Sequence, residues 1–180
     1  KYAERGDIHW RHWLEEPDFQ ARAMAVVEAV GSKDSVLDIG CGDGKITSLL
    51  KERCTHVCGI DDDPFAVGMA IGHGVKATHA SVYDFRLSGY WDCIVMTDVI
   101  EHLQWPIEAL RNVARITHEL VLTTPEFKDK KSLSDYHATE YTENEIGSLI
   151  CRSGWRVAQL NRIPMPKSGR FDFIIRARKE

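Results

Sequence analysis

The sequence lacks the features of several large protein classes. Its 180 residues contain no internal repeat, and no apolar run approaches the ~20 residues that a membrane-spanning helix needs. Only five cysteines are present, and this odd number without a Cys-x-x-Cys pair argues against a disulfide framework or a zinc knuckle. We therefore expect reduced thiols and, since no charged-then-apolar leader opens the chain, a cytoplasmic protein.

An excess of positive charge is also missing. The chain has 23 Lys and Arg residues against 27 Asp and Glu residues, which gives a formal net charge of −4. The field of the whole protein therefore does not favour a phosphate backbone, and nucleic acid is not an expected partner. A hydrophobic fraction of 43% and a charged fraction of 28% are typical of one globular domain, which we expect to span residues 1–180.

Strand-length apolar runs alternate with helical stretches along the chain. The expected strands are Ser35–Ile39, His56–Ile60, Val75–His79, Cys93–Thr97, Leu120–Thr123, Trp155–Leu160 and Phe171–Arg176. The expected helices are Pro17–Val30, Lys45–Arg53, Pro64–Ile71, Pro106–Ile116 and Thr142–Arg152. This alternation predicts an α/β fold with a Rossmann-like, doubly wound, mostly parallel sheet and helices on both faces. No helix separates the last two strands, so we expect a hairpin-like return and an antiparallel strand at one edge.

The start of the chain allows two interpretations. Its first sixteen residues are polar and aromatic, and they include Tyr2, His9 and Trp10. They form either a packed or frayed lead-in to the first long helix, which is the simpler expectation, or a lid over the active site.

A glycine-rich loop follows the first strand, at Asp38–Gly44, and a helix begins directly after it. Such a turn lies at the carboxyl end of the sheet, where open α/β folds bind ligands. Asp61 follows Gly40 by 21 residues, and a carboxylate there can accept both ribose hydroxyls of a nucleoside. A dinucleotide-binding loop would need a third glycine where Lys45 stands, and acids in the loop suit a cationic ligand. The pattern therefore favours a sulfonium nucleoside over NAD.

These segments resemble motifs of the class I S-adenosylmethionine-dependent methyltransferases: Val36–Gly44, Gly59–Asp61 and Trp91–Val99. The resemblance implies a seven-stranded sheet with an antiparallel last strand, with S-adenosylmethionine as cofactor and S-adenosylhomocysteine as product. It implies that Gly40 and Gly42 lie against the methionine part and that Asp61 binds the ribose. For the adenine we expect Ser81 and the backbone of Val82, with Asp84 as the alternative. The full expected cofactor set is Asp38, Gly40, Cys41, Gly42, Asp61, Asp62, Ser81, Val82, Thr97 and Asp98.

A second group of polar residues directly follows the fourth strand. Asp98, Glu101 and His102 lie within five residues, and His137 lies in a later loop that leaves the same edge of the sheet. A helical turn here would bring Asp98 near Glu101 and His102. We take Glu101, His102 and His137 as candidate catalytic residues, with one imidazole as the base that accepts the proton of an oxygen acceptor.

The same segment also resembles the Glu-x-x-Glu-His…His arrangement of small-RNA 3′-terminal 2′-O-methyltransferases and ubiquinone-biosynthesis O-methyltransferases. A divalent metal is therefore an alternative to direct base catalysis, although we expect none. Its ligands would be Asp98, Glu101, His102 and His137, with Asp98 one methylene shorter than the usual Glu.

Together these patterns predict the transfer of a methyl group from S-adenosylmethionine to an oxygen of a small molecule, such as a sugar, a glycan or a natural-product intermediate. Three alternatives stay open at this point. They are a metal-dependent RNA 2′-O-methyltransferase, an NAD-binding oxidoreductase and a nucleoside-binding module without catalysis.

Overall fold

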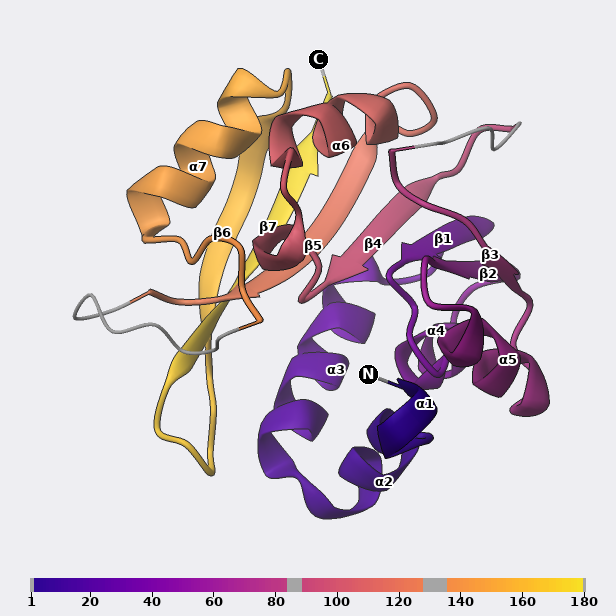
Figure 1. Ribbon diagram of the computed structural model, residues 1–180. Coiled ribbons are helices and arrows are strands. Elements are labelled where there is room, and N and C mark those ends of the chain that lie inside the picture. Colours follow the sequence, from indigo (N-terminus) through magenta and orange to yellow (C-terminus); the bar gives the residue numbers. More distant parts are fainter. Residues whose placement is uncertain (1, 84–88, 128–135, 180) are drawn as a thin grey trace.

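A computed structural model defines residues 2–83, 89–127 and 136–179 of the protein. Seven strands form one sheet in the order β3-β2-β1-β4-β5-β7-β6 (Figure 1). The strands are β1 (Ser35–Ile39), β2 (His56–Asp61), β3 (Ala77–His79), β4 (Cys93–Thr97), β5 (Glu119–Pro125), β6 (Arg156–Pro164) and β7 (Phe171–Arg178). This confirms the expected mostly parallel α/β sheet.

The first five strands pair in parallel, and β7 is antiparallel to both of its neighbours. The expected antiparallel last strand is confirmed and the hairpin lies at one edge of the sheet, but β7 is its inner strand and β6 forms the edge itself. A hairpin alone cannot tell which of its two strands meets the parallel sheet. Here β7 does, and its buried residues Phe173, Ile175 and Ala177 suit this inner position.

Two layers of helices cover the sheet. The helices are α1 (Tyr2–Arg5), α2 (Ile8–Glu15), α3 (Pro17–Val30), α4 (Lys45–Leu50), α5 (Pro64–Gly72), α6 (Pro106–Val113) and α7 (Glu143–Arg152), with a 3-10 turn η1 (Ile100–His102). One core packs α6 and α7 against the sheet, and the other packs α3 and α4 against it. Figure 1 shows α6 and α7 on one side and α3 on the other. Among the described residues, no helix is both long enough and apolar enough to cross a membrane.

Some elements are shorter than the apolar pattern predicts. The strand expected from Val75 begins only at Ala77, since the backbone N–H of Val75 donates to the carbonyl of Ala70 and closes the end of α5 (2.9 Å). The helix expected to reach Arg53 ends at Leu50 and continues as turns. An apolar residue at the end of a run can donate its backbone N–H to the end of the preceding helix instead of joining a strand. The apolar pattern is the same for both outcomes.

The start of the chain contains two helices that the sequence did not reveal, α1 and α2. None of the eight residues of helix α2 is fully buried, so this helix contributes little to the hydrophobic core. It packs beside α3 and reaches the loop after β1 (Figure 1). The N-terminal residues are therefore a packed segment of the fold at the carboxyl edge of the sheet.

Candidate active site

The carboxyl ends of the parallel strands converge at one edge of the sheet. Strands β1 and β2 end at Ile39 and Asp61, and β4 and β5 end at Thr97 and Pro125. Because β1 pairs with both β2 and β4, the loops that follow these three strands are neighbours. The glycine loop, Asp61 and the polar residues after β4 therefore lie next to one another. Open α/β sheets bind their ligands at this edge.

The glycines of the loop after β1 are required by geometry. Gly40 has φ 74° and Gly42 has φ 57°, in the left-handed region that side chains rarely adopt. A Cβ atom at Gly40 would overlap the Val99 side chain after β4, and one at Gly42 would overlap the Tyr2 hydroxyl. The loop therefore passes so close to its surroundings that only glycine fits.

Asp61 fixes the loop from the end of the adjacent strand. One carboxylate oxygen accepts the backbone N–H of Gly42 at 2.8 Å, and the other accepts that of Asp63 at 2.9 Å. Burial raises the pKa of the Asp61 carboxyl, although these two N–H donors oppose the shift. A carboxylate offers about four acceptor positions, so both oxygens keep capacity for ligand hydroxyls.

Asp38 lies deeper, at the end of β1. Its carboxylate is 1% exposed and accepts the hydroxyl of Thr47 at 2.6 Å. Burial raises the pKa of this carboxyl to about 7, so a nearby positive charge would stabilise its ionised form. Cys41 is buried too, and its thiol fills the space that a Cβ at Gly59 would need.

The other expected cofactor residues lie along the same edge. Asp62 is exposed on the loop after β2, and its carbonyl oxygen lies 3.1 Å from Nε2 of His79. After β3, the Ser81 hydroxyl accepts the backbone N–H of Tyr83, and Val82 is buried in the core. Thr97 ends β4, and its buried hydroxyl has no partner among the described residues. Asp84, the alternative adenine residue, lies outside the described residues.

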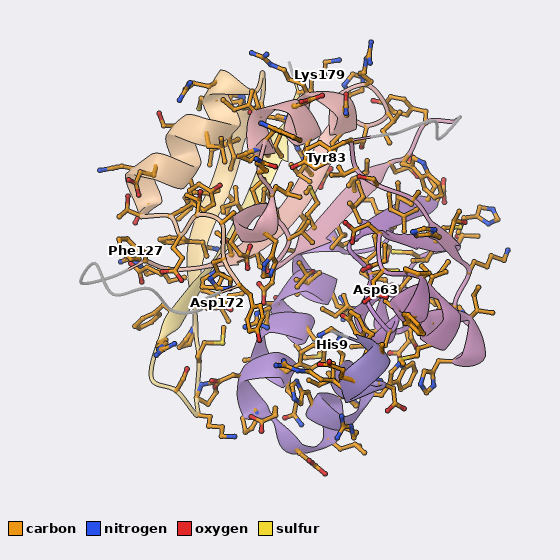
Figure 2. All side chains as sticks on the ribbon, viewed as in Figure 1. His9, Asp63, Tyr83, Phe127, Asp172 and Lys179 are labelled. Atoms are coloured by element: carbon orange, nitrogen blue, oxygen red, sulfur yellow. The ribbon has the colours of Figure 1, made fainter. Side chains whose placement is uncertain are left out.

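Asp98 lies close enough to Glu101 for its charge to raise the pKa of Glu101, but its own carboxylate binds partners outside this turn. It adopts φ 51°, and its carboxylate binds Arg22 of α3 at 2.8 Å and the Thr123 hydroxyl at 2.8 Å. Arg22 also binds Asp172 of β7 at 2.6 Å, so it bridges two carboxylates (Figure 2, which labels Asp172). Burial alone would lower the pKa of Arg22, but the two carboxylates outweigh it and raise that pKa. The Asp98 carboxylate is therefore held by an ion pair with a helix distant in sequence, which the local spacing does not reveal.

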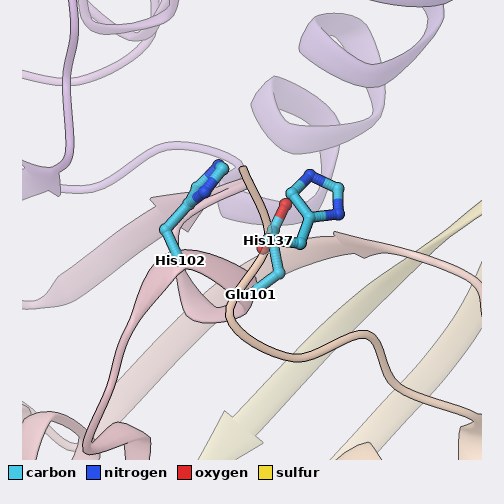
Figure 3. A group of neighbouring side chains, drawn as sticks. All are labelled: Glu101, His102 and His137. Carbon is cyan, nitrogen blue, oxygen red and sulfur yellow. The ribbon is translucent and has the colours of Figure 1, made fainter. Parts of the chain in front are cut away.

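Glu101, His102 and His137 do come together (Figure 3). Each offers one ligand atom, and these three atoms all lie within 4.8 Å of one another. The backbone holds the arrangement, since the N–H groups of Ala138 and Thr139 both donate to the carbonyl of Glu101, at 2.8 and 3.1 Å. We call these three side chains the triad.

The two imidazoles are oriented by acceptors on their Nδ1 atoms. Nδ1 of His102 lies 3.0 Å from the carbonyl oxygen of Tyr136, which can only accept, so Nδ1 donates. Nδ1 of His137 lies 2.9 Å from a carboxylate oxygen of Glu140. In a neutral imidazole this places the lone pair on Nε2, the atom that ligates a metal or accepts a proton.

Glu101 is the unusual member of the triad. It is 1% exposed, and neither carboxylate oxygen has a hydrogen bond of good geometry among the described residues. Burial raises the pKa of its carboxyl well above the usual range, and the charge of Asp98 adds to the shift. The Thr124 hydroxyl and Arg22 oppose the shift without reversing it. Ionising so buried a carboxyl is costly, and a cation or a donor from a ligand would relieve that cost.

The triad therefore fits two kinds of chemistry. One oxygen and two nitrogen donors suit a divalent transition metal ion, and such an ion would stabilise the ionised form of the buried Glu101 carboxyl. Asp98, which the sequence analysis counted among the possible ligands, is absent from this group because Arg22 and Thr123 hold its carboxylate. Without a metal, either imidazole can act as a base.

Two residues of the site were missed by sequence reasoning. Arg22 sits in the middle of an amphipathic helix, where a charged residue normally faces solvent, and nothing local marks it as a partner of β4 and β7. Glu140 could have been found, since it follows His137 by three residues and carboxylates commonly orient ligating imidazoles.

A protein-family model described as a methyltransferase domain matches residues 10–160 of the chain. Among curated proteins, the ubiquinone biosynthesis O-methyltransferase of Aromatoleum aromaticum is 32% identical over 89 residues. That match covers 45% of this chain and 38% of the relative. The chain thus matches about two fifths of the length of that relative.

Solved structures of similar fold include an N-methyltransferase of Bradyrhizobium japonicum in complex with S-adenosyl-L-homocysteine. Its TM-score is 0.79 at 19% identity, covering 94% of this chain and 91% of the other. The magnesium protoporphyrin IX methyltransferase of Synechocystis PCC 6803 with bound S-adenosylhomocysteine has a TM-score of 0.77 at 16% identity, covering 99% and 96%. At these identities the likeness shows a shared fold.

The partly buried ion network of Arg22, Asp98 and Asp172 yields a stability prediction. Replacing Arg22→Met would leave Asp98 and Asp172 without their counter-charge, and we expect a loss of about 3–5 kcal/mol in the free energy of unfolding. Urea unfolding followed by circular dichroism measures it. Arg11→Met is the matched control, because the side chain of Arg11 is 58% exposed and its contact with Asp7 is 4.0 Å long; we expect a change within about 0.5 kcal/mol. Equal, small effects of both substitutions would contradict a structural role for the bridge.

Proposed function

The chain belongs to the methyltransferase-domain family, and from this premise we propose that it transfers a methyl group from S-adenosylmethionine to an oxygen atom of a small-molecule acceptor. The observation that carries the proposal is the juxtaposition of two sites at one sheet edge. One is an acid-rich glycine loop anchored by Asp61, and the other is the triad.

The loop supports a cationic nucleoside cofactor. Asp61 keeps acceptor capacity for the two ribose hydroxyls, and Asp38 is a buried carboxyl that a positive charge would stabilise. S-Adenosylmethionine carries a ribose, a sulfonium and an ammonium group, and so it matches both features. A dinucleotide carries a negatively charged pyrophosphate instead, which the carboxylates here would repel. Gly40 and Gly42 would leave room for the methionine part.

The triad supports an oxygen acceptor. Methyl transfer breaks the carbon–sulfur bond of the sulfonium and forms a carbon–oxygen bond, so the cofactor leaves as a neutral thioether. An alcohol or phenol must also lose its proton, and an imidazole Nε2 of His102 or His137 can take it. An amine acceptor would need less help of this kind. The ubiquinone-type O-methyltransferase relatives agree with this preference, although they match only part of the chain.

Aligning acceptor and cofactor contributes most to such a reaction. Holding two reactants in attack geometry can lower the barrier by about 7–11 kcal/mol at best. Because Val99 packs directly on Gly40, the polar turn after β4 is held against the cofactor loop. This contact would fix the position of the bound acceptor relative to the methyl group of the cofactor. The net charge of −4 favours a small molecule over RNA as the acceptor.

We further propose that the triad holds a divalent metal ion, the alternative that the sequence alone did not favour. The buried carboxyl of Glu101, whose oxygens make no hydrogen bond of good geometry among the described residues, and the two oriented imidazoles support it. A bound cation would supply positive charge that lowers the pKa of the acceptor hydroxyl. Glu101, His102 and His137 would be its ligands, and Glu140 would position His137 through Nδ1.

The cofactor assignment predicts the effect of removing Asp61. Asp61→Ala should weaken S-adenosylhomocysteine binding at least tenfold, about 1.4 kcal/mol, because charge-assisted hydrogen bonds to the ribose are lost. Isothermal titration calorimetry measures the affinity, and a thermal melt verifies that the variant is folded. Glu28→Ala, an exposed carboxylate on α3, is the control and should bind as the native chain does. An unchanged affinity of Asp61→Ala would place the ribose elsewhere.

The metal assignment predicts chelator sensitivity. Protein treated with EDTA should lose methyl-transfer activity and recover it when Mn²⁺ or Co²⁺ is added. The activity is measured with radiolabelled S-adenosylmethionine and a panel of hydroxylated acceptors. Titration with Co²⁺, followed by its visible absorption, should saturate at one equivalent. Glu101→Gln should abolish this binding, and Glu140→Gln should weaken it about 10–100-fold.

Exposed Glu108 on α6 provides the matched control, since Glu108→Gln should bind Co²⁺ normally. Full activity after EDTA treatment, or native Co²⁺ affinity in Glu101→Gln, would refute the metal. Proton removal by His102 or His137 would then stand as the acceptor-activating step.

A further inference from the structure

Residues 2–13, which include α1 and most of α2, lie directly on the proposed cofactor loop; we call them the N-terminal cover. Tyr2 is only 6% exposed, and its hydroxyl abuts Gly42. The backbone N–H of His9 donates to the Asp43 carboxylate at 2.7 Å, and the indole N–H of Trp10 donates to the Asp43 carbonyl at 2.9 Å. Figure 2 labels His9 within this segment. The cover therefore binds the loop at Asp43, through the backbone of His9 and the indole of Trp10.

Lys45 forms a second attachment. This residue begins α4 directly after the loop, and its Nζ atom lies 4.4 Å from the ring centre of Trp10 and 4.6 Å from that of Trp13. Lys45 is only 7% exposed, and burial lowers the pKa of its ammonium group, while the charge of Glu52 opposes that shift. The ammonium group thus lies over two indole rings and is largely removed from water, an arrangement in which cation–π attraction is strong.

A third attachment joins the cover to α5. Trp10 stacks on His73 with ring centres 4.2 Å apart, and Nε2 of His73 lies 3.3 Å from the Asp7 carboxylate. Trp10 is therefore in contact with Asp43, Lys45 and His73 together. These attachments come from the loop, the start of α4 and the end of α5, so the cover is linked to the proposed cofactor loop and to the two helices beside it.

The cover is nevertheless weakly built into the core. None of the eight residues of α2 is fully buried, whereas α3 buries five of its fourteen. Segments with few buried apolar contacts open locally at a small fraction of the global unfolding free energy. The cover can therefore separate from the loop while α3 and the sheet stay folded.

From these contacts we propose that the N-terminal cover is a gate for cofactor exchange, and that Lys45 between Trp10 and Trp13 is its latch. This inference rests on the proposed function, because it assigns the loop to S-adenosylmethionine. The spent cofactor must leave and a fresh one must enter in each turnover, and Tyr2 and His9 occupy the space beside Gly42. Opening of the cover then precedes both steps, as lid motions do in many enzymes.

A gate has a kinetic signature that a binding residue lacks. Stopped-flow measurement should show that Lys45→Met raises both the association rate and the dissociation rate of S-adenosylhomocysteine about tenfold, with the Kd within about twofold of the native value. Lys45→Arg keeps the cation and should restore near-native rates. Lys51→Met is the matched control, since Lys51 lies just past the same helix and its Nζ is bound to the carbonyl of Gly74 at the surface; its rates should stay native.

Hydrogen–deuterium exchange provides a readout that needs no cofactor. Lys45→Met should speed exchange of the α2 amides and leave those of α3 unchanged. Native rates and native α2 exchange in Lys45→Met would overturn the gate, as would a changed Kd with unchanged dissociation. If the native chain fails to bind S-adenosylhomocysteine at all, the proposed function falls and takes the gate with it. If the native chain binds and only the rates of Lys45→Met stay native, the gate alone fails.

Discussion

The parallel pairing of β1 with both β2 and β4 is the constraint on which the rest of the site depends. In this register Asp38 lies opposite Gly59 and Val95, so the loops that leave the three strands emerge side by side. The glycine loop can then accept support from Asp61 on one side and from Val99 on the other. A shift of one residue would turn the loop and the acids to different faces. The buried, continuously apolar strands hold the register that the chemistry needs.

An uneven distribution of charge follows from this arrangement. Asp38, Asp61 and Glu101 have carboxyl groups whose pKa burial raises, and Arg22 forms its ion pairs with Asp98 and Asp172. The edge therefore holds more acidic groups than positive partners among the described residues. Such a site favours ligands that bring positive charge, and both proposed ligands do so: the sulfonium cofactor at the loop and a divalent cation at the triad.

The sequence predicted the parts of the molecule that depend on local pattern. Ser35–Ile39 and Cys93–Thr97 are strands with the expected bounds, because continuous apolar runs between turn residues have few other uses. The grouping of Glu101, His102 and His137 also followed, since strand ends meet at one edge. Contacts over long sequence distances could not be predicted in this way. Nothing near Arg22 indicates that it reaches Asp98 and Asp172, and nothing in the α2 segment reveals that Trp10 and Trp13 enclose Lys45.

The central claim is that the loop after β1 binds S-adenosylmethionine and its product S-adenosylhomocysteine, and not a dinucleotide. Calorimetric titration of the native chain with S-adenosylhomocysteine, and separately with NAD⁺, tests it most directly. The account predicts saturable one-to-one binding of S-adenosylhomocysteine that an excess of NAD⁺ does not displace. Saturable binding of NAD⁺, with no heat from S-adenosylhomocysteine, would contradict it.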